Sequence, residues 1–142
     1  MGKRLNRTLL AGLLLCIPLI SHAAGLGRLT VHSGLGQPLR AEIEIVSLER
    51  GEVESLTAKL AGQEAFRQAN IDLTPALQNL RFTIEQRPNN RHVVLMSSSG
   101  PVNEPFLDVL VELSWATGRL IREYTFLLDP QEFKSAAPQQ IV

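Results

Sequence analysis

Residues 101–130 read PVNEPFLDVLVELSWATGRLIREYTFLLDP, and this stretch decides the fold. A turn marked by proline and asparagine leads into a ten-residue apolar run from Phe106 to Trp115. The short loop Ala116-Thr117-Gly118 precedes a second run, Arg119 to Leu128, and Pro130 ends it. Two long runs joined by a short loop that contains glycine predict a β-hairpin, and therefore a β fold.

The register of this hairpin stays open on the sequence alone. A three-residue loop places Glu112 opposite Arg122, an ordinary cross-strand charge pair. A two-residue turn instead aligns Trp115 with Leu120, which packs better. The same turn sets Glu112 against Glu123, two like charges. Both runs are apolar on both faces, which is typical of strands near the middle of a sheet.

Alternation of apolar and polar residues predicts five more strands. The clearest is residues 39–46, where Ala41, Ile43 and Ile45 face one side and charged residues face the other. The composition of residues 62–70 predicts one short helix, and Thr74-Pro75 is typical of a helix start. The remaining strands are expected at residues 25–33, 56–60, 81–85 and 92–98. Seven strands with one or two short helices predict a mainly β, immunoglobulin-like β-sandwich.

The first 23 residues have the pattern of a secretory signal peptide. Basic residues precede an apolar segment at residues 9–20, and Ser21-His22-Ala23 puts small residues where a signal peptidase cleaves. Twelve apolar residues span only about 18 Å as a helix, short of the roughly 30 Å of a bilayer core. We therefore expect cleavage before Ala24 and a mature chain without a membrane span. Attachment to the inner membrane is expected only if the signal stays uncleaved or the chain is a fragment.

Cleavage would leave a slightly acidic chain without cysteine. It removes three of the 14 basic residues, none of the 14 acidic ones, and the only cysteine, Cys16. The resulting net charge of about −3 argues against nucleic acid as a partner. Without disulfides, the domain must be held together by its hydrophobic core. We expect one domain at residues 24–130, followed by a linker or frayed tail at residues 131–142.

The residues offer no pattern for catalysis. His32 and His92 are the only histidines of the mature chain, too few for a zinc site. No Gly-x-Ser-x-Gly motif is present, and the run of serines at residues 97–99 is typical of the passage from a strand to a turn. Asp108 and Glu112 would lie about 13 Å apart along a strand, beyond the roughly 5 to 9.5 Å of glycosidase carboxylates. We predict no catalytic residue, no metal and no cofactor.

Two groups of side chains have alternative interpretations. Trp115 and Tyr124, the only residues of their kinds, would form a carbohydrate-stacking platform if they were exposed. Their place in the apolar hairpin favours the core instead. Arg81, Arg87 and Arg91 fall on one predicted hairpin, where charged residues favour a solvated strand edge.

Three separated segments resemble the N-terminal periplasmic domain of FimV proteins. They are GLGRLTVHSGLGQPLRAEIEI (residues 25–45), QEAFRQANID (residues 63–72) and residues 101–130. The resemblance runs from the signal peptide to Pro130. FimV proteins are polar-hub and assembly factors of the type IV pilus machinery in Gram-negative bacteria. In that family a peptidoglycan-binding LysM module, a transmembrane helix and a cytoplasmic tetratricopeptide region follow the domain.

The resemblance implies a non-enzymatic periplasmic domain that supports secretin assembly and twitching motility through protein partners. Peptidoglycan would be reached only through modules absent from this chain. The chain ends where the linker toward LysM would begin, so we expect either a fragment or a single-domain relative.

Of the three motifs that make the resemblance specific, two are turns and the third is the strand segment Arg-Glu-Tyr-Thr. The two turns are the candidate contact points, although turn geometry alone also explains their composition. Their residues are Gly36, Gln37, Pro38, Asn103, Glu104 and Pro105. The rival hypothesis is a peptidoglycan- or carbohydrate-binding envelope module, which requires an exposed Trp115 or Tyr124.

Overall fold

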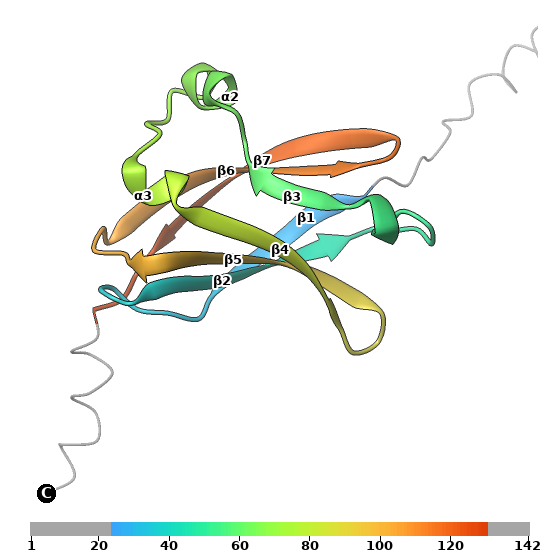
Figure 1. The fold of residues 1–142 in the computed structure, drawn as a ribbon, viewed down its shortest axis with the longest axis horizontal. Coiled ribbons are helices and arrows are strands. Elements are labelled where there is room, and N and C mark those ends of the chain that lie inside the picture. The colour runs from blue at the N-terminus through green and yellow to red at the C-terminus, as the bar shows by residue number, and fades with distance from the viewer. Residues whose placement is uncertain (1–23, 131–142) are drawn as a thin grey trace, which may run out of the picture.

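The computed structural model describes residues 24–130 as two packed antiparallel sheets (Figure 1). The signal peptide expected at residues 1–23 and the tail expected at residues 131–142 lie outside the described residues. The strands are β1 (Gly25–Val31), β2 (Pro38–Val46), β3 (Thr57–Leu60), β4 (Leu80–Arg87), β5 (Arg91–Pro101), β6 (Phe106–Trp115) and β7 (Gly118–Leu127). The predicted β-sandwich of seven strands is confirmed.

The order of the strands in each sheet shows which strands are central and which lie at an edge. One sheet has the order β1-β2-β5-β4 and the other has the order β3-β6-β7. Strand β6 is therefore central, as its two apolar faces predict. Strand β7 is an edge strand, so the prediction that both hairpin strands lie near the middle of a sheet is wrong for β7. Its outward residues, among them Arg119 and Glu123, are exposed.

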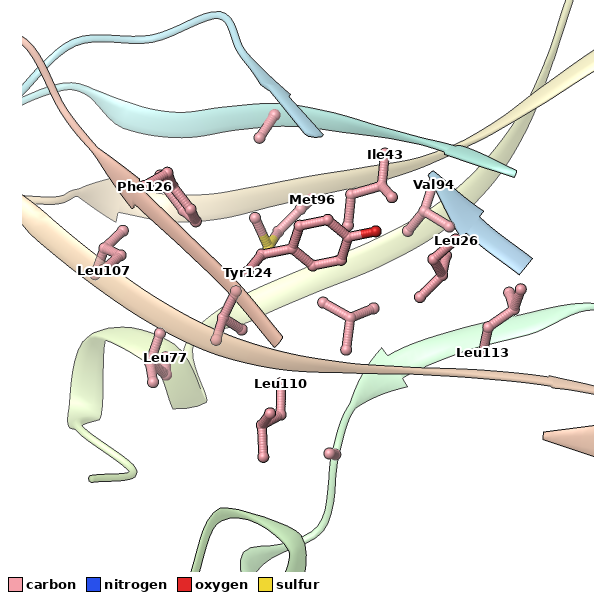
Figure 2. Close-up of a cluster of buried hydrophobic side chains, with 14 of the residues drawn as sticks. Leu26, Ile43, Leu77, Val94, Met96, Leu107, Leu110, Leu113, Tyr124 and Phe126 are labelled. Atoms are coloured by element: carbon pink, nitrogen blue, oxygen red, sulfur yellow. The ribbon is translucent and has the colours of Figure 1, made fainter. Parts of the chain in front are cut away.

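The alternation in β2 divides the four-stranded sheet into an inner and an outer face. Ala41, Ile43 and Ile45 are buried, as predicted, while Arg40 and Glu44 are exposed on the other side. Inward residues of both sheets meet in one core (Figure 2). The side chains labelled there include Ile43, Val94 and Met96 from the first sheet and Leu107, Leu113, Tyr124 and Phe126 from the second.

The hairpin β6–β7 takes neither of the two registers considered above. Trp115 pairs with Gly118, so the turn consists of Ala116 and Thr117, and Glu112 lies opposite Ile121. This register keeps the odd-numbered residues of β6 and the even-numbered residues of β7 on the inner face. It aligns three apolar pairs against the other sheet: Leu107 with Phe126, Val109 with Tyr124, and Leu113 with Leu120.

Substitution of Gly118 tests this register. A Cβ at Gly118 would lie 3.1 Å from Cζ2 of Trp115, so the indole must move in Gly118→Ala. We expect a shift of the tryptophan fluorescence emission and a loss of about 1 to 3 kcal/mol of stability. Trp115 is the only tryptophan, so the emission reports on the surroundings of this one side chain. Gly100→Ala, where a Cβ meets nothing within 4 Å, should leave the emission unchanged; an unchanged spectrum in Gly118→Ala would contradict the register.

A crossover segment joins β3 to β4 and carries two short helices, α2 (Gln63–Gln68) and α3 (Pro75–Gln78). Both predicted helix positions are confirmed. Each helix buries one residue, Phe66 in α2 and Leu77 in α3. Leu110, on the outward side of β6, points toward these helices in Figure 2 and is also buried. The crossover therefore covers part of the outer face of the three-stranded sheet.

One short element remains among the described residues. A 3-10 turn, η1 (Val53–Ser55), lies between β2 and β3. Within residues 24–130, no helix is long and apolar enough to cross a membrane.

Candidate functional site

The two turns singled out from the sequence lie against each other at one end of the sandwich, although about 65 residues separate them. The backbone N–H of Gly36 donates to the carbonyl of Val102 at 2.7 Å. The N–H of Val102 donates in return to the carbonyl of Gln37 at 3.0 Å. Gly36 has a φ of 81°, a left-handed conformation that glycine adopts without strain. The structure thus joins both turns into one surface.

Further backbone contacts fix this surface to the end of β7. The N–H of Leu35 donates to the carbonyl of Asp129 at 2.8 Å, and the N–H of Leu128 donates to the carbonyl of Pro105 at 2.8 Å. The side chain of Gln37 accepts from the N–H of Gly34 at 2.8 Å. All six candidate contact residues are exposed: Gly36, Gln37, Pro38, Asn103, Glu104 and Pro105. We call these six residues the paired turns; in Figure 1 they lie at the left end of the fold.

Ser98 supports the paired turns from β5. Its Oγ accepts from the N–H of Leu39 at 2.7 Å and donates to the carbonyl of Gly100 at 2.7 Å. The hydroxyl is therefore engaged by the backbone on both sides. This agrees with the interpretation of the serine run as the passage from a strand to a turn.

The two carboxylates considered for catalysis have separate surroundings. Asp108 accepts a hydrogen bond from Thr125 Oγ1 at 3.2 Å. Glu112 is only 6% exposed, and its Oε1 lies 3.9 Å from both Lys59 Nζ and an Arg119 guanidinium nitrogen. The pairing of Glu112 with Arg122, one of the two alternatives considered for the hairpin, does not form, because the register turns Arg122 to the opposite face of the sheet.

Arg122 and Tyr124 instead close the gap between β7 and β1. The Tyr124 hydroxyl donates to the carbonyl of Gly27 at 2.7 Å, and Arg122 donates to the carbonyl of Leu26. The Arg122 guanidinium lies 5.0 Å from the centre of the Tyr124 ring. Tyr124 is only 8% exposed. Trp115 is partly buried and packs against the core. The structure therefore places both aromatic side chains with the core, as their position in the hairpin predicts.

The phenol of Tyr124 yields a prediction about pH. Burial raises the pKa of Tyr124 above its ordinary value of 10.0, and the nearby Arg122 charge only partly offsets the rise. The fold favours the neutral phenol, so its contribution to stability is present below pH 10 and disappears as the pH rises through the folded pKa. We expect the unfolding free energy of the wild type to fall more steeply above about pH 10 than that of Tyr124→Phe.

Tyr124 is the only tyrosine, so its ionisation can be followed directly by absorbance. The titration midpoint of the folded chain should lie above that of the denatured chain. A midpoint equal to or below the denatured value would contradict the burial of this hydroxyl.

Six ionisable side chains form surface ion pairs on the outer face of the four-stranded sheet. His32 Nε2 lies 3.7 Å from Glu42 Oε2, and Arg87 pairs with both Glu42 and Glu85. Arg91 lies 3.4 Å from Glu44. Such exposed pairs contribute little to stability. Among residues 24–130, no group of three or more potential ligands is placed to hold a metal ion.

Comparison with known proteins identifies the family. The family model described as "FimV N-terminal domain Ig-like domain" matches residues 24–131. The chain belongs to the FimV family. It is 41% identical over 124 residues to two proteins named "Motility hub protein FimV", from Pseudomonas aeruginosa strains PAO1 and UCBPP-PA14. The match covers 84% of this chain but only 14% and 13% of those two proteins. No solved structure gives a significant match.

This FimV N-terminal domain has a further surface feature that sequence reasoning missed. A shallow groove of about 290 Å³ begins at Glu104 of the paired turns and is also lined by Phe106, Asp72 and Thr74. The sequence predicts Phe106 in an apolar strand, and only its position beside a proline-marked turn indicates that this end of the strand is exposed. The contribution of Asp72 and Thr74 depends on the crossover, and no local pattern predicts it.

Proposed function

We propose that this domain acts in the periplasm by protein–protein contact, without catalysis, and supports type IV pilus assembly and twitching motility. The process is suggested by the 41% identity to motility hub proteins named FimV. The contact between the two turns is the observation that supports action by protein–protein contact. Two motifs that are far apart in sequence form one exposed surface, tied together by backbone hydrogen bonds.

The positions of the polar side chains support a non-enzymatic role. The Ser98 hydroxyl is held by two backbone groups, and Glu112 lies buried between two cations. The Tyr124 hydroxyl is bonded to β1. These groups hold the fold together, and a surface built mainly from turn backbone and short polar side chains is suited to recognition of another protein.

We propose the protein partners to be components of the pilus machinery, with assembly of the outer-membrane secretin as the step served. The N-terminal pattern of residues 1–23 supports export to the periplasm. The rival function, binding of peptidoglycan or another carbohydrate, has little support, because the aromatic side chains proposed for it pack with the core.

An in-frame deletion of the codons for residues 24–130 in the native host tests the proposal. We expect smaller twitching zones and fewer heat-resistant secretin multimers on immunoblots. Expression of the intact chain from a second locus should restore both. Unchanged twitching and secretin assembly in the deletion strain would overturn the proposed function. Retention of the purified domain on cell-wall sacculi would support the carbohydrate rival instead.

A further inference from the structure

The groove beside the paired turns lies between the crossover segment and the start of β6. Its lining mixes apolar and polar residues, and its most exposed large apolar side chain is Phe106, which is 55% exposed. Leu127 is the cross-strand partner of Phe106 and is 67% exposed on the same outer face. Two large apolar side chains therefore stand side by side in solvent at this end of the sheet. The groove is lined by Asn70, Ile71, Asp72, Thr74, Leu77, Glu104, Phe106, Leu107 and Asp108.

The charged residues that line the groove are all acidic. Asp72, Glu104 and Asp108 line the groove, and no lysine or arginine does. None of the three has a cationic partner within 4.0 Å among the described residues. By contrast, the carboxylates of the four-stranded sheet, such as Glu42 and Glu44, are paired with arginine. The groove thus combines exposed apolar surface with negative charge that the described part of the chain leaves unbalanced.

Thr74, which lines the groove, has a side-chain oxygen without a hydrogen-bond partner among the described residues. Thr74 precedes α3 at the position that usually caps a helix, but its side chain makes no capping hydrogen bond. Its Oγ1 is buried and has no hydrogen-bond partner among residues 24–130. A buried hydroxyl without a partner is costly, so the crossover is locally less stable where Thr74 lines the groove.

We propose that this groove binds a segment of a partner protein in which lysine or arginine side chains alternate with aliphatic ones. The aliphatic side chains would cover Phe106 and Leu127, and the cations would lie against Asp72, Glu104 and Asp108. The proposal rests on the proposed function and names the chemistry of the partner. Glu104 belongs both to the paired turns and to the groove, so one partner can contact both surfaces.

The charge pattern favours this occupant over two others. A divalent cation needs several carboxylates converging on one point, and the described residues contain no such group. A second copy of the chain would have to present a basic face, whereas residues 24–130 carry 13 acidic against 10 basic side chains, and Arg87 and Arg91 are paired with carboxylates of their own sheet.

Titration of the ¹⁵N-labelled chain with three synthetic peptides, each six residues long, tests the proposal. The first peptide alternates lysine and valine, the second alternates glutamate and valine, and the third alternates lysine and serine. We expect only the first to bind measurably at physiological salt. The amide signals that move should belong to residues 70–74 and 104–108. Equal binding of the lysine–serine peptide, or signal changes centred elsewhere, would overturn the proposal.

Charge-matched variants separate a local site from the general field of an acidic protein. The groove variant is Asp72→Asn, Glu104→Gln, Asp108→Asn; the control variant is Glu49→Gln, Glu54→Gln, Glu123→Gln, three carboxylates without an ion pair elsewhere on the described surface. Both change the net charge equally. We expect about tenfold weaker binding of the lysine–valine peptide to the groove variant and less than about twofold for the control. Equal weakening in both would overturn the proposal.

Phe106→Ser tests whether the apolar contact contributes to peptide binding. Phe106 is exposed, so its replacement should leave the fold intact. It should weaken the lysine–valine peptide as well, and unchanged binding would overturn the proposal. Calcium binding at the carboxylates, or a dimer of the chain that the groove variant abolishes, would assign the groove to another occupant. In the native host, twitching of the groove variant is compared with that of the deletion strain. Normal twitching of the groove variant, combined with loss of twitching in the deletion strain, would contradict the proposed binding role of the groove but not the proposed function of the domain.

Discussion

Replacement of Leu113 by alanine is expected to lower the free energy of unfolding by about 2 to 5 kcal/mol. Leu113 is 0% exposed and lies on β6, the central strand of its sheet. Its neighbours across the strands are Ala58 on β3 and Leu120 on β7, so the lost volume cannot be filled without moving a whole strand. Chemical denaturation followed by the fluorescence of Trp115 measures the change.

Leu127→Ala is the matched control, because it removes the same atoms from the same hairpin. Leu127 is 67% exposed, and we expect its replacement to change stability by less than about 0.5 kcal/mol. Equal destabilisation by the two substitutions would mean that the inner and outer faces of the hairpin have been assigned wrongly. Such a result would contradict the register of β6 and β7.

Replacement of Phe66 by alanine is expected to detach the crossover from the sandwich. Phe66 is the only buried side chain of α2 and is 1% exposed, and loss of such an aromatic side chain typically costs about 3 to 5 kcal/mol. A helix of six residues has little stability of its own, so α2 should unfold locally. Limited proteolysis with trypsin reports this event directly, because Arg67 lies within the helix.

We expect cleavage after Arg67 to accelerate more than cleavage at any other site in Phe66→Ala. Gln68→Ala, an exposed change in the same helix, should leave the rate unchanged. The N–H of Ile71 donates to the carbonyl of Phe66 at 2.9 Å, so unfolding of α2 should also displace the wall of the groove and weaken the lysine–valine peptide. Cleavage that accelerates equally at all sites would contradict an independently anchored crossover.

Much of the fold follows from local patterns in the sequence. The alternation in residues 39–46 predicts which side of β2 faces the core, because side chains alternate across a strand and only one face is apolar. Helix positions in the crossover follow from helix formers and from Thr74-Pro75. These predictions succeed because each depends on residues within a few positions of one another.

The hairpin register and the edge position of β7 depend on distant partners. The turn chemistry of residues 116–118 fits several loop lengths, and packing against the four-stranded sheet decides among them. Apolar residues on both faces of β7 predict a central strand. The structure places β7 at an edge, and the apolar residues of its outward face, Ile121 and Leu127, are exposed in the described part of the chain.

The candidate site was predictable only in part. Glycine, asparagine and proline mark both turns, but their meeting depends on the pairing of β2 with β5, which starts at Pro38 and Pro101. The groove joins Glu104 to Asp72 through the crossover, a contact that no local pattern encodes. The proposed process comes from family resemblance, since the residues themselves point only to a stable domain with an exposed contact surface.

Site-specific photo-crosslinking in living cells of the native host tests the central claim most directly. A photoreactive residue is placed at Asn103, in the paired turns, and in a second strain at Thr83, which is exposed on the outer face of the four-stranded sheet. We expect position 103 to give a covalent adduct with a component of the type IV pilus machinery, and position 83 to give none. Adducts with that machinery at position 83 alone, or at neither position, would contradict the assignment of the paired turns as the contact surface.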